Sequence, residues 1–286
     1  MSDSKANPTV LVIGAMKCAS SSLRRGLGQH PEICFLDGSD PSFFSDESQW
    51  QRGWSWYHGL FDPCAARVIG EGSNSYSMQS QYPCCARRIA ESLPAVKLIY
   101  IVRDPLTRIE STWIQVRSHG GENVHHNFNR SVLSDTDHLI DPTDYWKQIN
   151  AYRDYFSDDQ ILILFTEDLK ADPMAFFYRC FIFLDVDPDF VVEGADERIN
   201  RSKGKFITRS LLSKLRTVPG YRVMPKLLPR QLRAAIRQKM FLKRMVDRPA
   251  WHSDTRRWAL DQLRESSLML LRHCGKPETF WNLQDR

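Results

Sequence analysis

The segment that most restricts the fold lies near the start of the chain. Residues 9–14, with the sequence TVLVIG, form an uninterrupted apolar and mostly β-branched run. Such a run is typical of a strand that is buried on both faces. A short turn follows, and the pattern then predicts a helix over 21–29 that ends before Pro31, because proline disfavours helix in the residue ahead of it. These residues therefore predict a parallel sheet between helical layers.

The rest of the first two hundred residues repeats this alternation of short apolar runs and helical patterns. Further strands are predicted at 33–36, 68–70, 97–102 and 160–165. Helices are predicted at 50–61, 81–93, 105–116, 144–156 and 173–184. After residue 200 the predicted helices are 208–216, 229–246 and 254–273. The sequence thus predicts a single α/β domain over residues 1–286, with a core at 1–200 and a basic helical layer at 201–286.

The composition excludes several classes of protein. A chain of 286 residues with 42% hydrophobic and 26% charged residues has the composition of an ordinary globular protein. No apolar run approaches the roughly 20 residues that a membrane span needs, and residues 1–8 lack the features of a secretory signal. We therefore expect a cytoplasmic protein without membrane insertion. The seven cysteines are irregularly spaced without a CxxC pair, which predicts reduced thiols rather than a disulfide framework or a zinc site.

Positive charge gathers in one stretch of the chain. Residues 201–248 hold 15 Lys or Arg and one acid, Asp247, while the whole chain has a net charge of only +5. The tract is predicted to face water or something anionic. An anionic acceptor, an acidic carrier protein or a membrane surface would suit it. Nucleic acid is not expected, because no RNA- or DNA-binding module accompanies the tract.

The turn after the first strand, residues 14–23 with the sequence GAMKCASSSL, is a predicted anion site. The start of a helix offers unpaired backbone NH groups and the positive end of the helix dipole. Lys17 and the hydroxyl groups of Ser20, Ser21 and Ser22 add further donors. An ATP-type Walker A loop is excluded, because GxxxxGK(S/T) places its lysine after the second glycine. The alternative is an ordinary helix start with a solvated lysine.

A second motif begins with the strand at 97–102 and continues as RDPLTRIESTW. Asp104 as N-cap and Pro105 at the first helical position set the start of a helix. Arg103 is thereby placed at the carboxyl edge of the sheet, where open α/β sheets bind ligands. The helical face predicted to reach the ligand carries Arg108, Ser111 and Gln115. A guanidinium and a hydroxyl group suit a phosphate, and the alternative for Arg103 is a structural ion pair.

Together these two motifs resemble those of the sulfotransferases that use 3′-phosphoadenosine 5′-phosphosulfate (PAPS). The first is similar to the family pattern GxxKCGTTSLxxxLxxHP, with Ala19 in place of a glycine and serines in place of threonines. The second contains the whole pattern RDPxxRxxSxW. Three later segments also resemble family patterns. Residues 68–76, VIGEGSNSY, are similar to GExSPxY with Asn74 in place of proline, and residues 160–169, QILILFTEDL, are similar to a later strand and helix of the family. Residues 202–205, SKGK, are similar to the SKGR loop of the heparan sulfate branch.

The resemblance implies a P-loop-like fold, PAPS as co-substrate and 3′,5′-ADP as product, with no metal. It implies a catalytic role for Lys17. The residues it places around the 5′-phosphate are Lys17, Cys18, Ala19, Ser20, Ser21 and Ser22. Those it places around the 3′-phosphate are Arg103, Ser111, Ser202, Lys203, Gly204 and Lys205.

An acceptor hydroxyl group must also lose a proton, which requires a general base near the sulfur. The resemblance places Asp40 where the heparan sulfate branch has the glutamate of KExxFF, which is one methylene longer. The alternatives are an ordinary turn role for Asp40 and a histidine base from the segment 117–142, which lacks periodicity and is predicted to be a lid or a binding loop. The histidines considered there are His119, His125 and His126. Glu71 is either a second carboxylate of the site or a structural one.

The sequence thus predicts transfer of a sulfuryl group from PAPS to a hydroxyl or amine of a small metabolite or natural product. A glycan acceptor is the alternative within the family. A kinase-like NTPase is disfavoured, because the Walker A and aspartate-based metal signals are missing. A non-catalytic nucleotide-binding module is a further alternative, supported by the changes at Ala19 and Asp40. The aromatic stripe Trp50, Trp54, Tyr57 and Phe61 has helical spacing and is predicted to pack in the core rather than to line an acceptor site.

Overall fold

A central sheet of five parallel strands organises the structure. The computed structural model describes residues 7–36, 38, 40–62, 64–118, 124–195, 206–208, 242–244 and 249–284. The strands of the sheet are β1 (Val10–Gly14), β2 (Ile33–Phe35), β3 (Val68–Gly72), β4 (Lys97–Val102) and β5 (Ile161–Phe165). Their order is β2-β3-β1-β4-β5, with β1 paired to β3 on one side and to β4 on the other. Every residue of β1 is buried, and the predicted parallel sheet is confirmed.

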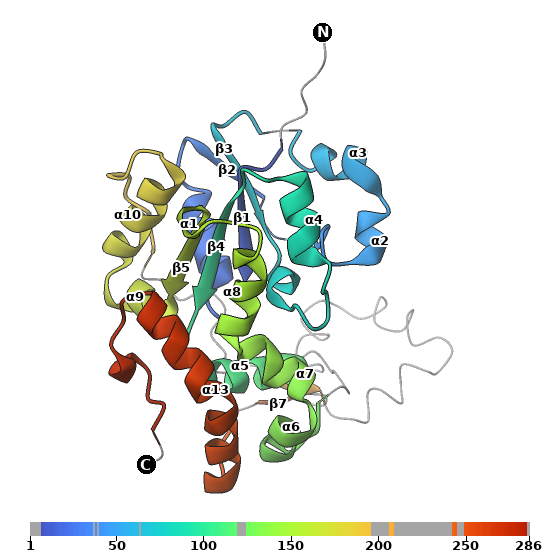
Figure 1. Ribbon diagram of the computed structural model, residues 1–286, viewed down its shortest axis with the longest axis vertical. Helices are drawn as coiled ribbons and strands as arrows, with labels where there is room; N and C mark the ends of the chain where they lie inside the picture. Colours follow the sequence, from blue (N-terminus) through green and yellow to red (C-terminus); the bar gives the residue numbers. More distant parts are fainter. Residues whose placement is uncertain are drawn as a thin grey trace, which may run out of the picture.

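Helices connect the strands and cover both faces of the sheet (Figure 1). The α-helices are α1 (Ser20–Leu27), α2 (Glu47–Trp50), α3 (Gly53–Gly59), α4 (Cys85–Ser92), α5 (Pro105–Ser118), α6 (Phe128–Ser134), α7 (Thr136–Leu139), α8 (Tyr145–Arg153), α9 (Thr166–Ala171), α10 (Pro173–Leu184) and α13 (Ser253–His273). Short 3-10 helices are η1 (Asn74–Ser77), η2 (Asp141–Thr143), η3 (Asp158–Gln160) and η5 (Glu278–Phe280). The predicted C-terminal helix is confirmed as α13, which packs against α8 and α5.

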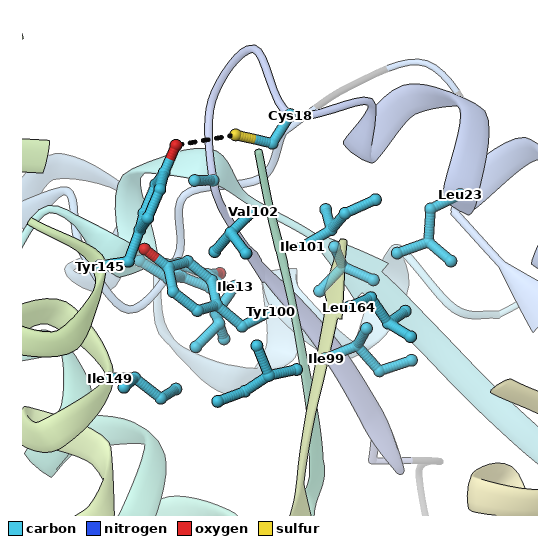
Figure 2. Close-up of a cluster of buried hydrophobic side chains, with 14 of the residues drawn as sticks. Ile13, Cys18, Leu23, Ile99, Tyr100, Ile101, Val102, Tyr145, Ile149 and Leu164 are labelled. Atoms are coloured by element: carbon cyan, nitrogen blue, oxygen red, sulfur yellow. Dashed lines mark hydrogen bonds between the residues drawn. The ribbon is translucent and has the colours of Figure 1, made fainter. Parts of the chain in front are cut away.

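The side chains of β4 contact both helical layers. Tyr100 lies on the same side of the strand as Tyr145 of α8, and their ring centroids are 6.1 Å apart (Figure 2). Ile99 and Ile101 lie on the other side, toward Leu23 of α1 (Figure 2). Successive strand residues point to opposite faces. A strand covered on both faces must therefore be apolar throughout its buried length, which is why the continuous apolar runs predict these strands well.

The predicted helix at 50–61 is wrong as a single element. Two short helices, α2 and α3, occupy this part of the chain, and Gly53 at their junction has a φ of 74°. This left-handed conformation interrupts an α-helix. The predicted core role of the aromatic stripe is confirmed, since Tyr57 stacks on Phe43 with ring centroids 4.3 Å apart and Phe61 is buried.

The segment predicted as a long loop, 117–142, is largely helical where the structure describes it. Helix α5 extends to Ser118, and α6, α7 and η2 follow from residue 128 onward. Oδ1 of Asn127 accepts a hydrogen bond from the backbone N of Arg130 at 3.0 Å and so caps α6. These helices are short, so their hydrophobic periodicity is too brief to stand out in the sequence.

The basic tract also departs from prediction at its described residues. Strands β6 (Phe206–Thr208) and β7 (Leu242–Arg244) form an antiparallel pair, whereas the sequence predicts helices starting at Thr208 and spanning 229–246. Pairing between segments far apart in sequence outweighs local helix propensity. The rest of 201–248 lies outside the described residues. The division of one domain at residue 200 stays a prediction.

One cysteine pair corrects the prediction that the thiols are reduced. Cys34 on β2 and Cys64 after α3 form a disulfide, with their Cα atoms 5.6 Å apart. The chain packs the residues that follow α3 beside β2, and cysteine spacing alone does not show this proximity. The free cysteines are Cys18, Cys84, Cys85, Cys180 and Cys274.

The close packing of α1 against α10 leads to a stability prediction. A methyl group added at Gly26 would lie 2.2 Å from Cζ of Phe177, and Phe177 is only 2% exposed. We expect Gly26→Ala to lower the free energy of unfolding by about 1–3 kcal/mol, because overpacking displaces the buried ring. Equilibrium unfolding in urea measures this difference.

Gly28→Ala is the matched control for this substitution. A methyl group there would meet no atom closer than 3.4 Å, and Gly28 has a right-handed φ of −70°. We expect Gly28→Ala to change the free energy of unfolding by less than about 1 kcal/mol. Equal stability of the two variants would show that α1 and α10 are not closely packed at Gly26.

Candidate active site

The loops that follow β1 and β4 meet at the carboxyl edge of the sheet. The two strands are neighbours, but the chain leaves β1 toward β2 on one side and leaves β4 toward β5 on the other. Open α/β sheets bind ligands at such a point, because the diverging loops leave a crevice between them. Lys17 follows β1 and Arg103 follows β4, so the topology brings the two predicted anion-binding segments together.

The loop after β1 has a backbone suited to an anion. Lys17 and Ala19 have φ values of 72° and 69°, in the left-handed region. Left-handed residues in a turn orient nearby amide groups toward one side of the chain, as in anion-binding nests. Ala19 is the N-cap of α1, and this helix has no side-chain cap. The Ser22 amide donates to the carbonyl of Ala19 at 3.0 Å, so the amide groups left for an anion or for water are those of Ser20 and Ser21.

Hydrogen bonds connect this loop to β4 and α5. Nη1 of Arg103 donates to the carbonyl of Lys17 at 3.0 Å and to Oγ of Ser111 at 3.2 Å. Nε of Arg103 is buried and has no hydrogen-bond partner among the described residues, so one donor of this guanidinium is not used within the described part of the protein. The structure thus places Arg103 and Ser111 in contact and joins both to the lysine loop.

Gln115 is a contact of Lys17 that sequence reasoning did not identify. Nζ of Lys17 donates to Oε1 of Gln115 at 3.3 Å. The sequence gives one indication of a role for Gln115, because helical spacing places it on the same face as Ser111. Periodicity places Gln115 on that face, but only the folded chain brings the loop after β1 over it.

Arg108 corrects the prediction made for the same helical face. Its side chain is fully buried, and Nη1 donates to Oγ1 of Thr143 at 2.7 Å. Residues 139–143 therefore cover this part of α5, and the guanidinium holds η2 rather than reaching toward a ligand. The helical face predicted to reach the ligand is therefore divided. Ser111 contacts Arg103, whereas Arg108 packs against residues 139–143.

The three predicted serines lie in different surroundings. Ser20 is buried, and its Oγ donates to Oδ1 of Asn74 at 3.0 Å. Ser21 is exposed and Ser22 is half-buried. The hydroxyl of Ser20 is therefore used within the protein, while its backbone amide belongs to the uncapped first turn of α1.

The thiol of Cys18 is buried and points toward the hydroxyl of Tyr145 of α8 (Figure 2). Its Sγ lies 3.6 Å from the hydroxyl of Tyr145, and burial raises the pKa of the thiol. Oγ1 of Thr166 donates to the carbonyl of Cys18 at 2.7 Å, which holds the loop against the end of β5. The role of Cys18 in nucleotide binding stays a prediction, and because its thiol is buried beside Tyr145, that role would fall to its backbone.

Asp40 reaches the same edge from the segment after β2. Its Oδ1 accepts from Nη1 of Arg24 at 2.6 Å. Its Oδ2 accepts from Nδ2 of Asn74 at 2.7 Å and from the Asn74 backbone N at 3.2 Å. The Asp40 side chain is 32% exposed, so the carboxylate borders solvent.

Gly72 leaves the space through which Arg24 reaches Asp40. A methyl group at Gly72 would lie 2.6 Å from Cδ of Arg24. The guanidinium also donates to the carbonyl of Gly72. Arg24 therefore connects α1, the end of β3 and the Asp40 carboxylate.

Glu71 is a second carboxyl group, buried beneath this edge. It is fully buried and accepts hydrogen bonds from the hydroxyls of Tyr57 at 3.2 Å, Tyr76 at 2.6 Å and Ser73 at 3.1 Å. Burial raises the pKa of Glu71 to about 7, despite these hydrogen bonds, and the nearby Asp40 charge adds to the rise. Glu71 does not border solvent. Of the two roles predicted for it, a second carboxylate of the site or a structural carboxylate, its burial agrees with the structural role.

Several predicted site residues lie outside the described residues. They are His119, Ser202, Lys203, Gly204 and Lys205. The other two histidines lie side by side before α6, with ring centroids of His125 and His126 4.0 Å apart. The pKa of His125 is lowered, first by desolvation and then by the nearby charges of His126 and Arg130.

Two features are absent from the part of the chain that the structure describes: a candidate metal site and a candidate membrane-spanning helix. Within it, no cluster of three or more His, Cys, Asp or Glu side chains is arranged to hold a metal ion. None of its helices combines the length and the apolar character needed to cross a bilayer.

Comparison with known proteins identifies the family. Residues 8–209, more than half of the chain, match the sulfotransferase domain family. The chain belongs to the sulfotransferase family. The resemblance drawn from the two motifs is thereby confirmed.

Individual relatives agree with this assignment. The chain is 35% identical to heparan sulfate glucosamine 3-O-sulfotransferase 6 of Mus musculus over 112 residues, which cover 39% of this chain and 31% of that protein. It is 28% identical over 203 residues to bifunctional heparan sulfate N-deacetylase/N-sulfotransferase 4 of Mus musculus, covering 64% and 23% of the two chains. The chain thus spans less than half the length of these curated relatives.

A solved structure supports the fold. The chain resembles the crystal structure of a sulfotransferase from Alicyclobacillus acidocaldarius with a TM-score of 0.60 and 26% identity. The match covers 68% of this chain and 87% of that one. The predicted sulfotransferase fold, with its P-loop-like parallel sheet, is confirmed.

The raised pKa of Glu71 predicts a pH dependence of stability. The native protein holds this proton up to a pH of about 7, whereas the ordinary value is 4.5. Between these values unfolding releases a proton, so the stability from this group is full below about pH 4.5 and declines as pH rises toward 7. We expect the decline to be on the order of 3 kcal/mol.

Glu71→Gln isolates this effect, because glutamine keeps the shape without titrating. We expect the stability of the variant, relative to the native sequence, to increase from about pH 5 to about pH 8. Urea unfolding at both pH values measures the relative change and cancels the titration of other groups. A difference that stays constant with pH would mean that Glu71 has an ordinary pKa in the folded protein.

Proposed function

We propose that this protein transfers a sulfuryl group from PAPS to a hydroxyl or amine of an acceptor. The observation that carries the proposal is the contact between the two predicted anion-binding segments at the carboxyl ends of β1 and β4. Lys17 and the uncapped start of α1 lie on one side, and Arg103 with Ser111 lies on the other. Two anchors for negative charge suit a nucleotide with phosphates at both ends of its ribose.

The loop after β1 would hold the 5′ end of this co-substrate. PAPS, when bound, supplies a sulfuryl group joined to its 5′-phosphate through a bridging oxygen. Negative charge grows on that oxygen as its bond to sulfur breaks and the bond from the acceptor to sulfur forms. The ammonium of Lys17 and the first amides of α1 would neutralise this charge, and one such donor typically lowers the barrier by about 3–4 kcal/mol.

Arg103 and Ser111 would hold the 3′-phosphate. Nε of Arg103 is the buried, unpartnered donor described above. The guanidinium can also form the paired hydrogen bonds that phosphate oxygens favour. We extend this role to Ser202, Lys203, Gly204 and Lys205, on their similarity to the family's SKGR loop. Binding at this end would distinguish PAPS from ATP.

Asp40 would act as the general base. Its carboxylate borders solvent at the same edge as Lys17, and an acceptor proton transferred to it leaves the acceptor atom free to attack sulfur. The Arg24 and Asn74 contacts orient the carboxylate without enclosing it. Glu71 is buried and would not meet the acceptor, and His119 remains the alternative base.

We propose a small metabolite or natural product as the acceptor, modified in the cytoplasm. A glycan is the second candidate, because relatives of this chain are named as heparan sulfate sulfotransferases. The basic tract at 201–248 would suit an anionic acceptor or an acidic carrier protein. The two relatives reported above are named for O- and N-sulfation, so the acceptor atom is part of what must be tested.

Mass spectrometry after incubation with PAPS tests the function directly. The acceptor panel contains small alcohols and amines of natural-product type, together with desulfated heparan oligosaccharides. The expected result is a mass gain equal to one SO3 unit on an acceptor, with release of 3′,5′-ADP. Hydrolysis of ATP with no PAPS-dependent transfer would instead favour an NTPase.

The two anchors predict different defects. We expect Lys17→Ala to lower kcat by about 100- to 1000-fold, because it removes a donor that stabilises the leaving oxygen. We expect Arg103→Ala to weaken binding of 3′,5′-ADP by about 10- to 100-fold, because it removes charged hydrogen bonds. Steady-state kinetics measure the first effect and isothermal calorimetry the second.

Arg67→Ala serves as the control for both variants. Arg67 is paired with Asp185 just before β3, at the opposite edge of the sheet. We expect unchanged turnover and nucleotide binding in this variant. Near-native behaviour of both Lys17→Ala and Arg103→Ala would contradict the proposed nucleotide site.

Asp40→Asn tests the base, because it removes basicity while preserving shape. We expect kcat to fall by about 100-fold or more, with the affinity for 3′,5′-ADP within about threefold of the native value. Retained turnover would transfer the role of base to a histidine such as His119.

A further inference from the structure

We propose that Asn74 is a positioning residue that holds the Asp40 carboxylate and links it to the first turn of α1. The inference rests on the proposed function, in which Asp40 is the base and α1 binds the nucleotide. It adds a residue that acts on the reaction through Asp40 without touching the reacting atoms.

The Asn74 amide contacts both elements at once. Its Nδ2 donates to Oδ2 of Asp40 at 2.7 Å, and its Oδ1 accepts from the hydroxyl of Ser20 at 3.0 Å. Its backbone N donates to the same Asp40 oxygen at 3.2 Å. One side chain therefore bridges the predicted base and the helix start that would receive the 5′-phosphate.

The second oxygen of Asp40 is held from the opposite side. Nη1 of Arg24, on the next turn of α1, donates to Oδ1 at 2.6 Å. Arg24 is itself held at the carbonyl of Gly72. With donors at both oxygens, the carboxylate can neither rotate nor withdraw without breaking a charged hydrogen bond.

Asn74 is attached to a buried hydrogen-bond network through its neighbour Ser73. Asn74 begins η1, directly after β3. The neighbouring Ser73 is buried, donates to Glu71 at 3.1 Å and accepts from the backbone N of Ser42 at 2.9 Å. Both ends of the Asp40–Asn74 contact are thus attached to the same buried network. A base held in this way loses little conformational freedom when the acceptor arrives.

Two substitutions separate the contacts of Asn74. Asn74→Ala removes both side-chain hydrogen bonds. Asn74→Asp keeps the acceptor for Ser20 but replaces the donor to Asp40 with a repelling oxygen. We expect both variants to lower kcat by about 10- to 100-fold, with the affinity for 3′,5′-ADP within about threefold of the native value.

A double variant tests whether Asn74 acts through Asp40. In the Asp40→Asn background the base is already absent, so adding Asn74→Ala should slow the residual turnover by less than about threefold. A multiplicative loss would overturn the proposal, as would native kcat in both single variants. Native activity in Asn74→Asp with loss only in Asn74→Ala would assign Asn74 to Ser20 alone, which also overturns it.

Asn150→Ala is the control for a general effect of removing an asparagine side chain. Asn150 lies on α8 and accepts from Arg153 at 3.2 Å, away from Asp40. We expect native kinetics in this variant. Failure of the proposed base and failure of this inference give different results. Full turnover in Asp40→Asn would show that Asp40 is not the base. An inactive Asp40→Asn variant together with native activity in the Asn74 variants would overturn only this inference.

Discussion

Burial of β1 on both faces is the constraint from which the site follows. A strand covered by helices on both sides pairs with parallel neighbours, and the carboxyl ends of those strands then lie at one edge. The loops that carry Lys17, Asp40, Asn74 and Arg103 each follow a strand of this sheet, so they meet although they are dispersed along the chain. The chain leaves β1 and β4 in opposite directions along the sheet, and the loops that follow these two strands bring Lys17 and Arg103 into contact.

Charge at this edge is arranged in two tiers. Near the surface, Arg24 neutralises Asp40, while Lys17 and Arg103 are oriented by neutral acceptors, a glutamine, a serine and a backbone carbonyl. Beneath them, Glu71 is surrounded by hydroxyl groups and has a pKa raised to about 7. With a pKa of about 7, the buried Glu71 carries only part of a negative charge near neutral pH, so it can support the segment around Asp40 without adding a full charge to the site.

Local sequence signals predicted the elements that depend on local physics. The strands were predictable because their apolar runs are continuous, and the start of α5 because Asp104 caps it, accepting from the Thr107 backbone N at 2.8 Å. A lysine followed by a helix start predicts an anion site in the loop after β1. The helix break at Gly53 is local, but it depends on a left-handed conformation that the helical pattern does not show. Where long-range packing decided the outcome, prediction failed: at β6 and β7, and at the buried Arg108.

By itself, therefore, the sequence determined the parallel sheet and the two motifs that identify the family, since each is encoded in a short, contiguous pattern. Only the tertiary structure decided which side chains meet. The disulfide between Cys34 and Cys64, the contact of Lys17 with Gln115 and the amide bridge from Ser20 through Asn74 to Asp40 all join residues distant along the chain. Such contacts depend on the relative placement of whole strands and helices, a property set by the packing of the entire core rather than by any local run of residues.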